Sequence, residues 1–161
     1  MNYPINSKHI DASVDFKAEA LRLLETSKSY LQANPWCGTI KNAWLFTNLG
    51  RVLCIFLYEI ENTQSPEDDF VWVMVGDFPP MYLDTINVIN TRQVIGAYVN
   101  LMNEWILQVE NDGPLEDCYP VIADRSPESL DILKKRMDLL HKMIEPQIAN
   151  IPISEYRNAV I

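Results

Sequence analysis

The chain has 161 residues, a length that suits one domain with its own hydrophobic core. Hydrophobic residues make up 48% and charged residues 22% of the sequence, values that are typical of globular proteins and exclude a disordered chain. Thirteen Lys and Arg against 22 Asp and Glu give a net charge of −9. Because such a surface repels phosphate groups, nucleic acids and anionic membranes are not the expected partners, and a basic protein is.

The cellular compartment can be inferred from three features of the sequence. The longest nearly uncharged apolar run, residues 52–58, is far too short to cross a bilayer. The N-terminal residues lack the apolar segment of a secretion signal. Cys37, Cys54 and Cys118 are odd in number and widely separated, which does not suggest a disulfide framework. We therefore expect a cytoplasmic protein.

The first half of the chain predicts one helix followed by strands. Apolar residues recur at spacings of three and four over residues 14–31, with Ser13 as the expected N-cap. Residues 43–47 and 52–60 are rich in β-branched and aromatic residues and read as a hairpin, and residues 70–75 read as a third strand. Sequential strands usually pair, which favours an antiparallel meander.

The strand at residues 52–60 carries apolar side chains on both of its faces. One face holds Leu53, Ile55, Leu57 and Glu59, and the other holds Val52, Cys54, Phe56, Tyr58 and Ile60. Since a strand with one solvated face alternates between apolar and polar residues, this pattern predicts a central strand that is covered on both sides.

The second half predicts two more helices. The two prolines in residues 76–80 are expected to stop the sheet, because proline lacks a backbone N–H. A helix capped by Thr91 should run to Glu110 and pack centrally, since most of its circumference is apolar. Residues 119–123 could form a short edge strand, and a third helix should follow Ser126 as N-cap. The expected fold is α+β: a single domain over residues 1–161, with a three- or four-stranded antiparallel meander and three main helices.

The sequence contains no recognisable catalytic motif. It has no phosphate loop, dinucleotide fingerprint, nucleophile elbow or zinc motif, and only five glycines. Its two histidines, His9 and His141, lie in no cluster with the spacing of metal ligands. We therefore expect no catalytic residue, no bound metal and no cofactor.

Acidic residues gather at two places, which are either solvated loops or a docking surface for basic side chains. Near them, Phe70 and Tyr119 could supply the aromatic anchors that interfaces favour. The predicted partner-binding residues are Glu59, Glu61, Glu67, Asp68, Asp69 and Phe70 around one loop, and Glu110, Asp112, Glu116 and Asp117 after the second helix.

A second candidate site follows the third strand. Asp77 and Asp84 could flank a shallow pocket with Tyr82, although a Gly-Asp before prolines is also typical of a simple turn. Asp68 and Asp77 should lie at opposite ends of the third strand, roughly 20 Å apart, too far for paired acid–base chemistry. Trp36, beside a proline in a connection, is expected to be more exposed than Trp44, Trp72 and Trp105.

Residues 72–83, Trp-Val-Met-Val-Gly-Asp-Phe-Pro-Pro-Met-Tyr-Leu, and residues 97–105, Ala-Tyr-Val-Asn-Leu-Met-Asn-Glu-Trp, resemble an uncharacterised bacterial family. In that family a strand ends in a Gly-Asp-x-Pro-Pro-x-Tyr turn ahead of a helix bearing a Tyr and a Trp. The resemblance covers about a third of the chain and implies a fold rather than an activity. The whole profile, small and acidic without a catalytic signature, is similar to that of immunity proteins that neutralise bacterial toxins.

Three functions fit these features. The sequence favours an immunity or inhibitor protein that binds a basic partner such as a toxin. The alternative is a small accessory or regulatory domain that binds a ligand at Asp77, Tyr82 and Asp84. An enzyme of unrecognised type is the least favoured, because histidines and glycines are scarce. The oligomeric state is not predicted.

Overall fold

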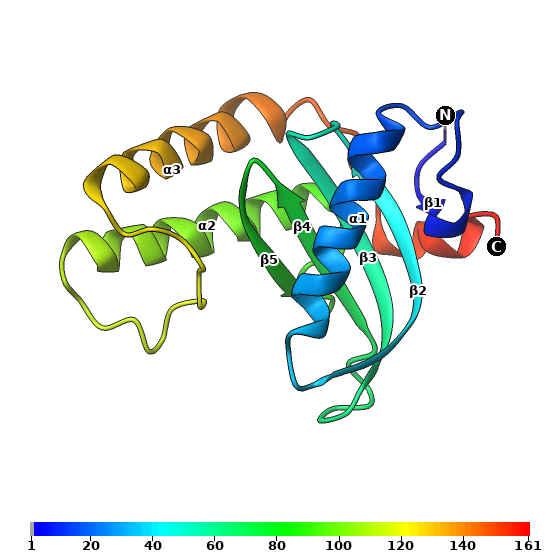
Figure 1. Ribbon diagram of the computed structural model, residues 1–161, viewed down its shortest axis with the longest axis horizontal. Helices are drawn as coiled ribbons and strands as arrows, with labels where there is room; N and C mark the ends of the chain where they lie inside the picture. The colour runs from blue at the N-terminus through cyan, green and yellow to red at the C-terminus, as the bar shows by residue number, and fades with distance from the viewer. Residues whose placement is uncertain (1) are drawn as a thin grey trace.

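The computed structural model of the protein describes residues 2–161 and contains a five-stranded antiparallel sheet (Figure 1). The strands pair in chain order, so each lies beside its neighbour in sequence. The strands are β1 (Ile5–Asn6), β2 (Cys37–Asn48), β3 (Leu53–Asn62), β4 (Phe70–Gly76) and β5 (Phe78–Asp84). The predicted α+β fold with an antiparallel meander is confirmed, with five strands instead of three or four.

The helices cover both faces of the sheet. α1 (Lys17–Gln32) lies in front of the sheet in Figure 1, whereas α2 (Thr91–Glu110) lies behind it with α3 (Pro127–Leu139) alongside. The three predicted helices are confirmed. Short helical turns complete the chain: η1 (Ser7–His9), η2 (Leu140–Ile144) and η3 (Ile153–Asn158).

β3 separates two hydrophobic cores. Its odd-numbered residues Leu53, Ile55 and Leu57 pack with α2 and α3, and its even-numbered residues Cys54 and Phe56 pack with α1. All five side chains are fully buried. The prediction of a central strand covered on both sides is confirmed, and so is the central position of α2, which contributes Tyr98, Met102 and Trp105 to its core.

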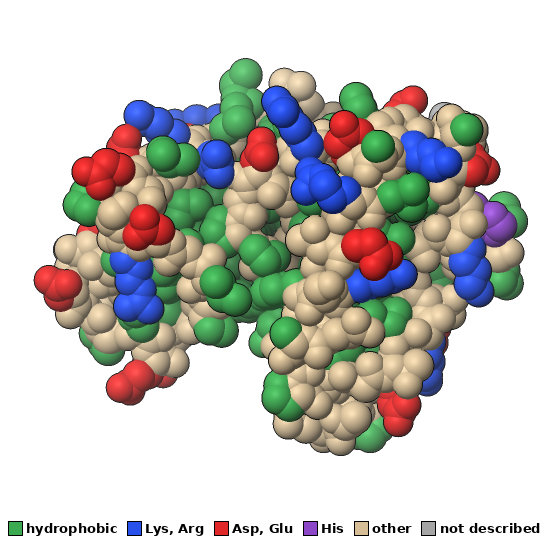
Figure 2. All heavy atoms as spheres, in the orientation of Figure 1, with side chains coloured by type: hydrophobic (Ala, Val, Ile, Leu, Met, Phe, Trp, Pro, Cys, Tyr) green, Lys and Arg blue, Asp and Glu red, His purple; other side chains and the backbone are tan. Residues whose placement is uncertain are grey.

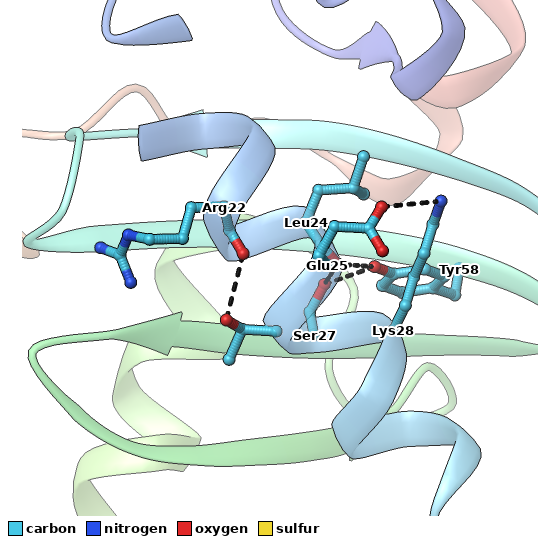
Figure 3. Close-up of polar contacts among 7 residues, drawn as sticks. Arg22, Leu24, Glu25, Ser27, Lys28 and Tyr58 are labelled. Atoms are coloured by element: carbon cyan, nitrogen blue, oxygen red, sulfur yellow. Dashed lines mark hydrogen bonds and ion pairs between the residues drawn. The ribbon is translucent and has the colours of Figure 1, made fainter. Parts of the chain in front are cut away.

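A buried polar contact joins α1 to the sheet (Figure 3). The hydroxyl groups of Ser27 and Tyr58 are hydrogen-bonded to each other, and the carbonyl oxygen of Leu24 lies 2.8 and 3.3 Å from them, so the hydroxyl that accepts from the other donates to this carbonyl. These two polar side chains are therefore satisfied inside an otherwise apolar core. On the exposed side of the helix, Glu25 and Lys28 form an ion pair of 3.7 Å.

Two predicted helix starts differ from the structure. Ser13 does not cap α1: it bonds to Asp11, and the helix begins after Phe16, which has a left-handed φ of 52°. At α2 the cap is Asn90, whose side chain accepts from Gln93 N–H at 2.9 Å. Thr91 is instead fully buried and bonds to the carbonyl of Ala149 in the C-terminal segment, a long-range contact that no local pattern contains. At α3, Ser126 is the cap as expected.

The prediction that residues 76–80 end the sheet is wrong. After Gly76 the chain turns and returns as β5, an edge strand, where a proline without an N–H costs little. Met74 pairs with Met81 and Gly76 with Phe78, so Val75 faces both prolines across a bulge. The bulge accommodates the two residues that could not pair regularly.

The predicted strand at residues 119–123 is also absent, because this part of the α2–α3 connection makes no backbone ladder with β5. Instead the Tyr119 hydroxyl accepts a hydrogen bond from Tyr82 N–H at 2.9 Å and is hydrogen-bonded to the Tyr30 hydroxyl on α1. One side chain thus links the connection, the sheet edge and α1. Figure 2 shows apolar side chains gathered in the hollow between α1 and this connection. Beside the connection, a pocket of about 420 Å³ lies between the start of β5 and α3, lined by Pro79, Ile122 and Leu133 among others.

Candidate functional site

The negative charge is concentrated in one part of the chain. Residues 52–124 contain 13 of the 22 acidic residues but only one of the 13 basic residues, Arg92. This segment forms β3, β4, β5, α2 and the connections between them. The excess of acidic residues over basic residues therefore comes from the ends of the sheet and from α2. The remaining residues carry a small excess of positive charge.

The β3–β4 loop (residues 63–69) is held in shape by the Asn62 side chain. Its Oδ1 accepts from the N–H groups of Gln64 and Ser65 at 3.0 and 2.9 Å, and its Nδ2 donates to the carbonyl of Asp68 at 3.2 Å. Within the loop, Asp68 N–H also donates to the Ser65 carbonyl at 2.9 Å. An asparagine that bonds to the backbone following it is a common way of stabilising a turn, so this acidic loop is preorganised.

The same loop is fastened to the α1–β2 connection. Thr63 N–H donates to the Trp36 carbonyl at 2.9 Å, and the Thr63 hydroxyl donates to the Pro35 carbonyl at 3.3 Å. These bonds fix the position of Trp36 relative to the loop, although 27 residues separate Trp36 from Thr63.

The predicted binding residues around this loop are all at the same end of the sheet, but they differ in exposure. Glu61, Glu67 and Asp68 are exposed, while Glu59, Asp69 and Phe70 are half-buried. None of the five carboxylates takes part in an ion pair within residues 2–161. Glu59 accepts a hydrogen bond from Asn42, at 2.9 Å.

Phe70 differs from the other predicted residues because its ring is already engaged. It packs against Trp44, with ring centroids 6.3 Å apart, and against Tyr156 at 5.0 Å. Phe70 therefore belongs to the edge of the α2-side core and is not a freely presented aromatic anchor.

The second predicted group, after α2, forms a separate surface. In Figure 1 the β3–β4 loop lies at the lower end of the sheet, whereas the end of α2 and the connection that follows lie at the far left. Glu110 is paired there with Lys134 of α3. Asp112, Glu116 and Asp117 are exposed. Because a cation already neutralises part of this group, the β3–β4 loop carries the less compensated charge.

The structure divides the second candidate site. Tyr82 and Asp84 line one pocket of about 270 Å³, which we name the Trp36 pocket. Asp77 does not join them: it precedes β5, whereas Asp84 ends it, and seven residues of strand span roughly 20 Å. The other residues that line the Trp36 pocket are Trp36, Asn62, Gln64, Ser65, Asp68, Phe70, Val71, Thr85 and Ile86.

The Trp36 pocket therefore combines residues of both predicted sites. Trp36 and Tyr82 meet edge to face, with ring centroids 4.9 Å apart and an interplanar angle of 70°. Asp84 Oδ1 accepts from the N–H groups of Ile86 and Asn87, both at 2.9 Å, which fixes that side chain at the end of β5. Trp36 is half-buried and the other three tryptophans are buried, as the sequence predicts.

Asp77 and its neighbours form a turn with a structural role. A Cβ added to Gly76 would lie 2.1 Å from the carbonyl oxygen of Val52, so no larger residue fits there without moving the backbone. Asp77 N–H donates to that carbonyl at 3.1 Å, and Arg136 of α3 donates to the carbonyl of Asp77. The Asp77 side chain itself is exposed.

The remaining reactive groups are dispersed. His9 and His141 are exposed, and His141 contacts Glu145 at 3.3 Å. Burial raises the pKa of the Cys54 thiol to about 12, which keeps it protonated. Within residues 2–161, no three His, Cys, Asp or Glu side chains lie close enough together to hold a metal ion. No helix of the same residues is long and apolar enough to span a membrane.

Sequence reasoning missed two contributions to the pocket. Trp36 attracts attention as the tryptophan beside a proline, but nothing local places it against Tyr82, which is 46 residues away. Asn62 follows a strand, where an asparagine commonly begins a turn, and that signal could have suggested its role in shaping the loop. No family model, curated protein or solved structure matches the chain, so both resemblances stay predictions.

Proposed function

We propose that this protein is a non-catalytic acidic binding protein that neutralises a basic protein partner, as an immunity protein neutralises a bacterial toxin. One observation supports this most directly: the β3–β4 loop presents exposed carboxylates without paired cations, and Asn62 preorganises the loop. The chain is then a cytoplasmic protein whose charge excludes nucleic acid and anionic membranes as partners.

Rigid, uncompensated charge favours capture of a basic protein in two ways. The field of several carboxylates steers an oppositely charged partner and raises the association rate. A loop that is already ordered loses little conformational entropy on binding, so more of the interaction energy appears as affinity. An inhibitor that must find a harmful protein quickly would benefit from both effects.

A pair of charge-reversal variants tests this proposal. Asp68→Lys with Asp69→Lys changes the β3–β4 loop, and Glu116→Lys with Asp117→Lys makes the same change of charge on the α2–α3 connection. The partner is isolated on the immobilised full-length protein, and the association rate is measured at several salt concentrations. We expect the loop variant to lower the rate about tenfold at low salt and to flatten its salt dependence, because electrostatic steering is lost.

The control variant should slow association much less, since its residues lie on a different surface. Equal effects of the two variants would show that only net charge matters and not the loop. Failure to recover any basic protein in a stoichiometric complex would overturn the proposed function itself.

The Trp36 pocket favours a second candidate function, a small accessory or regulatory domain that binds a low-molecular-weight ligand. Such sites are concave, with apolar walls and a few polar groups, and this pocket has both. A thermal-shift screen of metabolites distinguishes the two functions. A metabolite whose stabilising effect disappears in Trp36→Ala, together with no recoverable protein partner, would favour this alternative.

A further inference from the structure

The walls of the Trp36 pocket have the chemistry that recognises an organic cation. Three of its lining residues, Trp36, Phe70 and Tyr82, carry aromatic rings, and two others, Asp68 and Asp84, carry carboxylates. Among residues 2–161, no Lys, Arg or His lines it. An aromatic face attracts a nearby cation, and a carboxylate beside it adds a charge-assisted hydrogen bond.

The two carboxylates are not equivalent. Asp84 uses Oδ1 to accept two backbone N–H groups, so that side chain shapes the end of β5. The Asp68 carboxylate makes no hydrogen bond and no ion pair with residues 2–161, while its own backbone is anchored by Asn62. Asp68 can therefore offer both oxygens to a ligand from a fixed position.

The size of the pocket suits one side chain. Sites for drug-sized ligands usually measure about 300–1,000 Å³, and this pocket measures about 270 Å³. A planar guanidinium fits the lining better than an ammonium, because it stacks on aromatic rings and pairs with a carboxylate through two parallel hydrogen bonds.

We propose that the Trp36 pocket binds the guanidinium group of an arginine side chain supplied by a protein partner, with Asp68 as its carboxylate partner and Trp36 and Tyr82 as its aromatic walls. This inference rests on the proposed function and adds the residue by which the partner is recognised. The preorganised loop and the pocket then form one surface: the exposed carboxylates attract the basic partner, and the pocket accepts its arginine.

Nuclear magnetic resonance of the full-length protein tests the pocket without knowledge of the partner. The probe is arginine blocked at both ends, N-acetyl-arginine amide, and the readout is the indole N–H signal of each of the four tryptophans. We expect saturable binding, roughly millimolar for a single side chain, that moves the Trp36 signal. The buried indoles of Trp44, Trp72 and Trp105 should stay in place.

Two controls separate recognition from general attraction of positive charge. Blocked citrulline has the same shape as blocked arginine without the charge and should not bind. Asp68→Asn should weaken binding at least tenfold, whereas Asp69→Asn, the same change at the next residue, should leave it within twofold, because Asp69 does not line the pocket. Equal binding of citrulline, equal effects of the two variants, or no movement of Trp36 would each overturn the assignment.

The source of the arginine is tested in the same titration. Free arginine that binds more tightly than the blocked form would identify an amino-acid ligand and overturn the assignment to a protein side chain. The pocket and the proposed function can also fail separately. Arginine binding without any basic partner would sustain the pocket alone, and a partner that binds Asp68→Asn and Asp69→Asn equally well would sustain the function alone.

Discussion

Gly76 shows how one residue fixes the turn between β4 and β5. Its Cβ position is occupied by the backbone carbonyl of Val52, and its φ is 159°. We expect Gly76→Ala to lower the free energy of unfolding by about 2–3 kcal/mol, because a methyl group there forces the backbone apart. The urea midpoint of the variant measures this loss.

Gly96 provides the matched control for that substitution. It lies within α2, and an added Cβ would meet only a Glu145 oxygen, at 3.5 Å, an ordinary contact. Gly96→Ala should therefore stabilise the protein by about 0.5–1 kcal/mol, because alanine restricts the unfolded chain more than glycine does. If both variants changed stability in the same direction, the close approach at Gly76 would not be the cause.

At the scale of the elements, β5 is an exposed edge that the fold protects in two ways. The N–H of Tyr82 points away from β4 and is bonded to the Tyr119 hydroxyl. Pro79 and Pro80, at the bulge of the same strand, have no N–H to offer to another chain. An edge that offers fewer free donors is a poorer template for another strand.

Tyr119→Phe should expose this edge. The variant keeps the ring, whose centroid lies 5.3 Å from that of Tyr82, but removes the acceptor for Tyr82 N–H. We expect a loss of about 1 kcal/mol in stability and faster hydrogen exchange of the Tyr82 amide. The control is Tyr30→Phe, which also breaks the Tyr30–Tyr119 contact but leaves the acceptor in place. Rapid exchange in both variants would argue against the cap.

The elements that the sequence predicts well are those with strong periodicity. The alternation of residues along β3 assigns its side chains to the correct cores, because the two faces of a strand hold alternate residues. The apolar spacing in α2 likewise predicts a central helix, because it places apolar side chains around most of the helix. The sequence does not predict β5, because two adjacent prolines normally interrupt a sheet, whereas a bulged edge strand accepts them. The prediction that Ser13 caps the first helix is wrong, because the Ser13 side chain bonds to Asp11 and the helix begins only after Phe16.

The candidate site can be predicted only in part from the sequence, because its residues come together through long-range contacts. Asp68, Tyr82 and Asp84 are all singled out there, but as members of two different sites. Their association depends on β4 and β5 pairing and on the loop being fastened beside Trp36, which are long-range contacts. Local sequence patterns therefore identify these residues as candidates, but only the tertiary structure shows which of them line the same pocket.

At the scale of the whole molecule, buried and half-buried tyrosines make the protein sensitive to alkali. Burial raises the pKa of Tyr58, Tyr98, Tyr119 and Tyr30 above the ordinary value of 10.0. Below that value the phenols are protonated in both the folded and the unfolded chain. Above it the unfolded chain loses protons that the folded chain keeps, so the free energy of unfolding falls as the pH rises.

This dependence predicts a lower urea midpoint at about pH 11 than at about pH 8, with tyrosine ionisation appearing together with unfolding. Tyr58→Phe should reduce the slope, because it removes one of the four phenols. A urea midpoint that is flat over this range would show that these hydroxyls ionise without unfolding.

The order of the strands also bears on how the chain folds. From β3 to β5 each strand pairs with the one just before it, through connections short enough to close quickly. The pairing of Ile5 with Leu45 and the bridge from Asn90 to Pro152 join distant segments instead, and each closes a long loop. The hairpins that carry the Trp36 pocket can therefore form early, and the two ends of the chain dock onto them last.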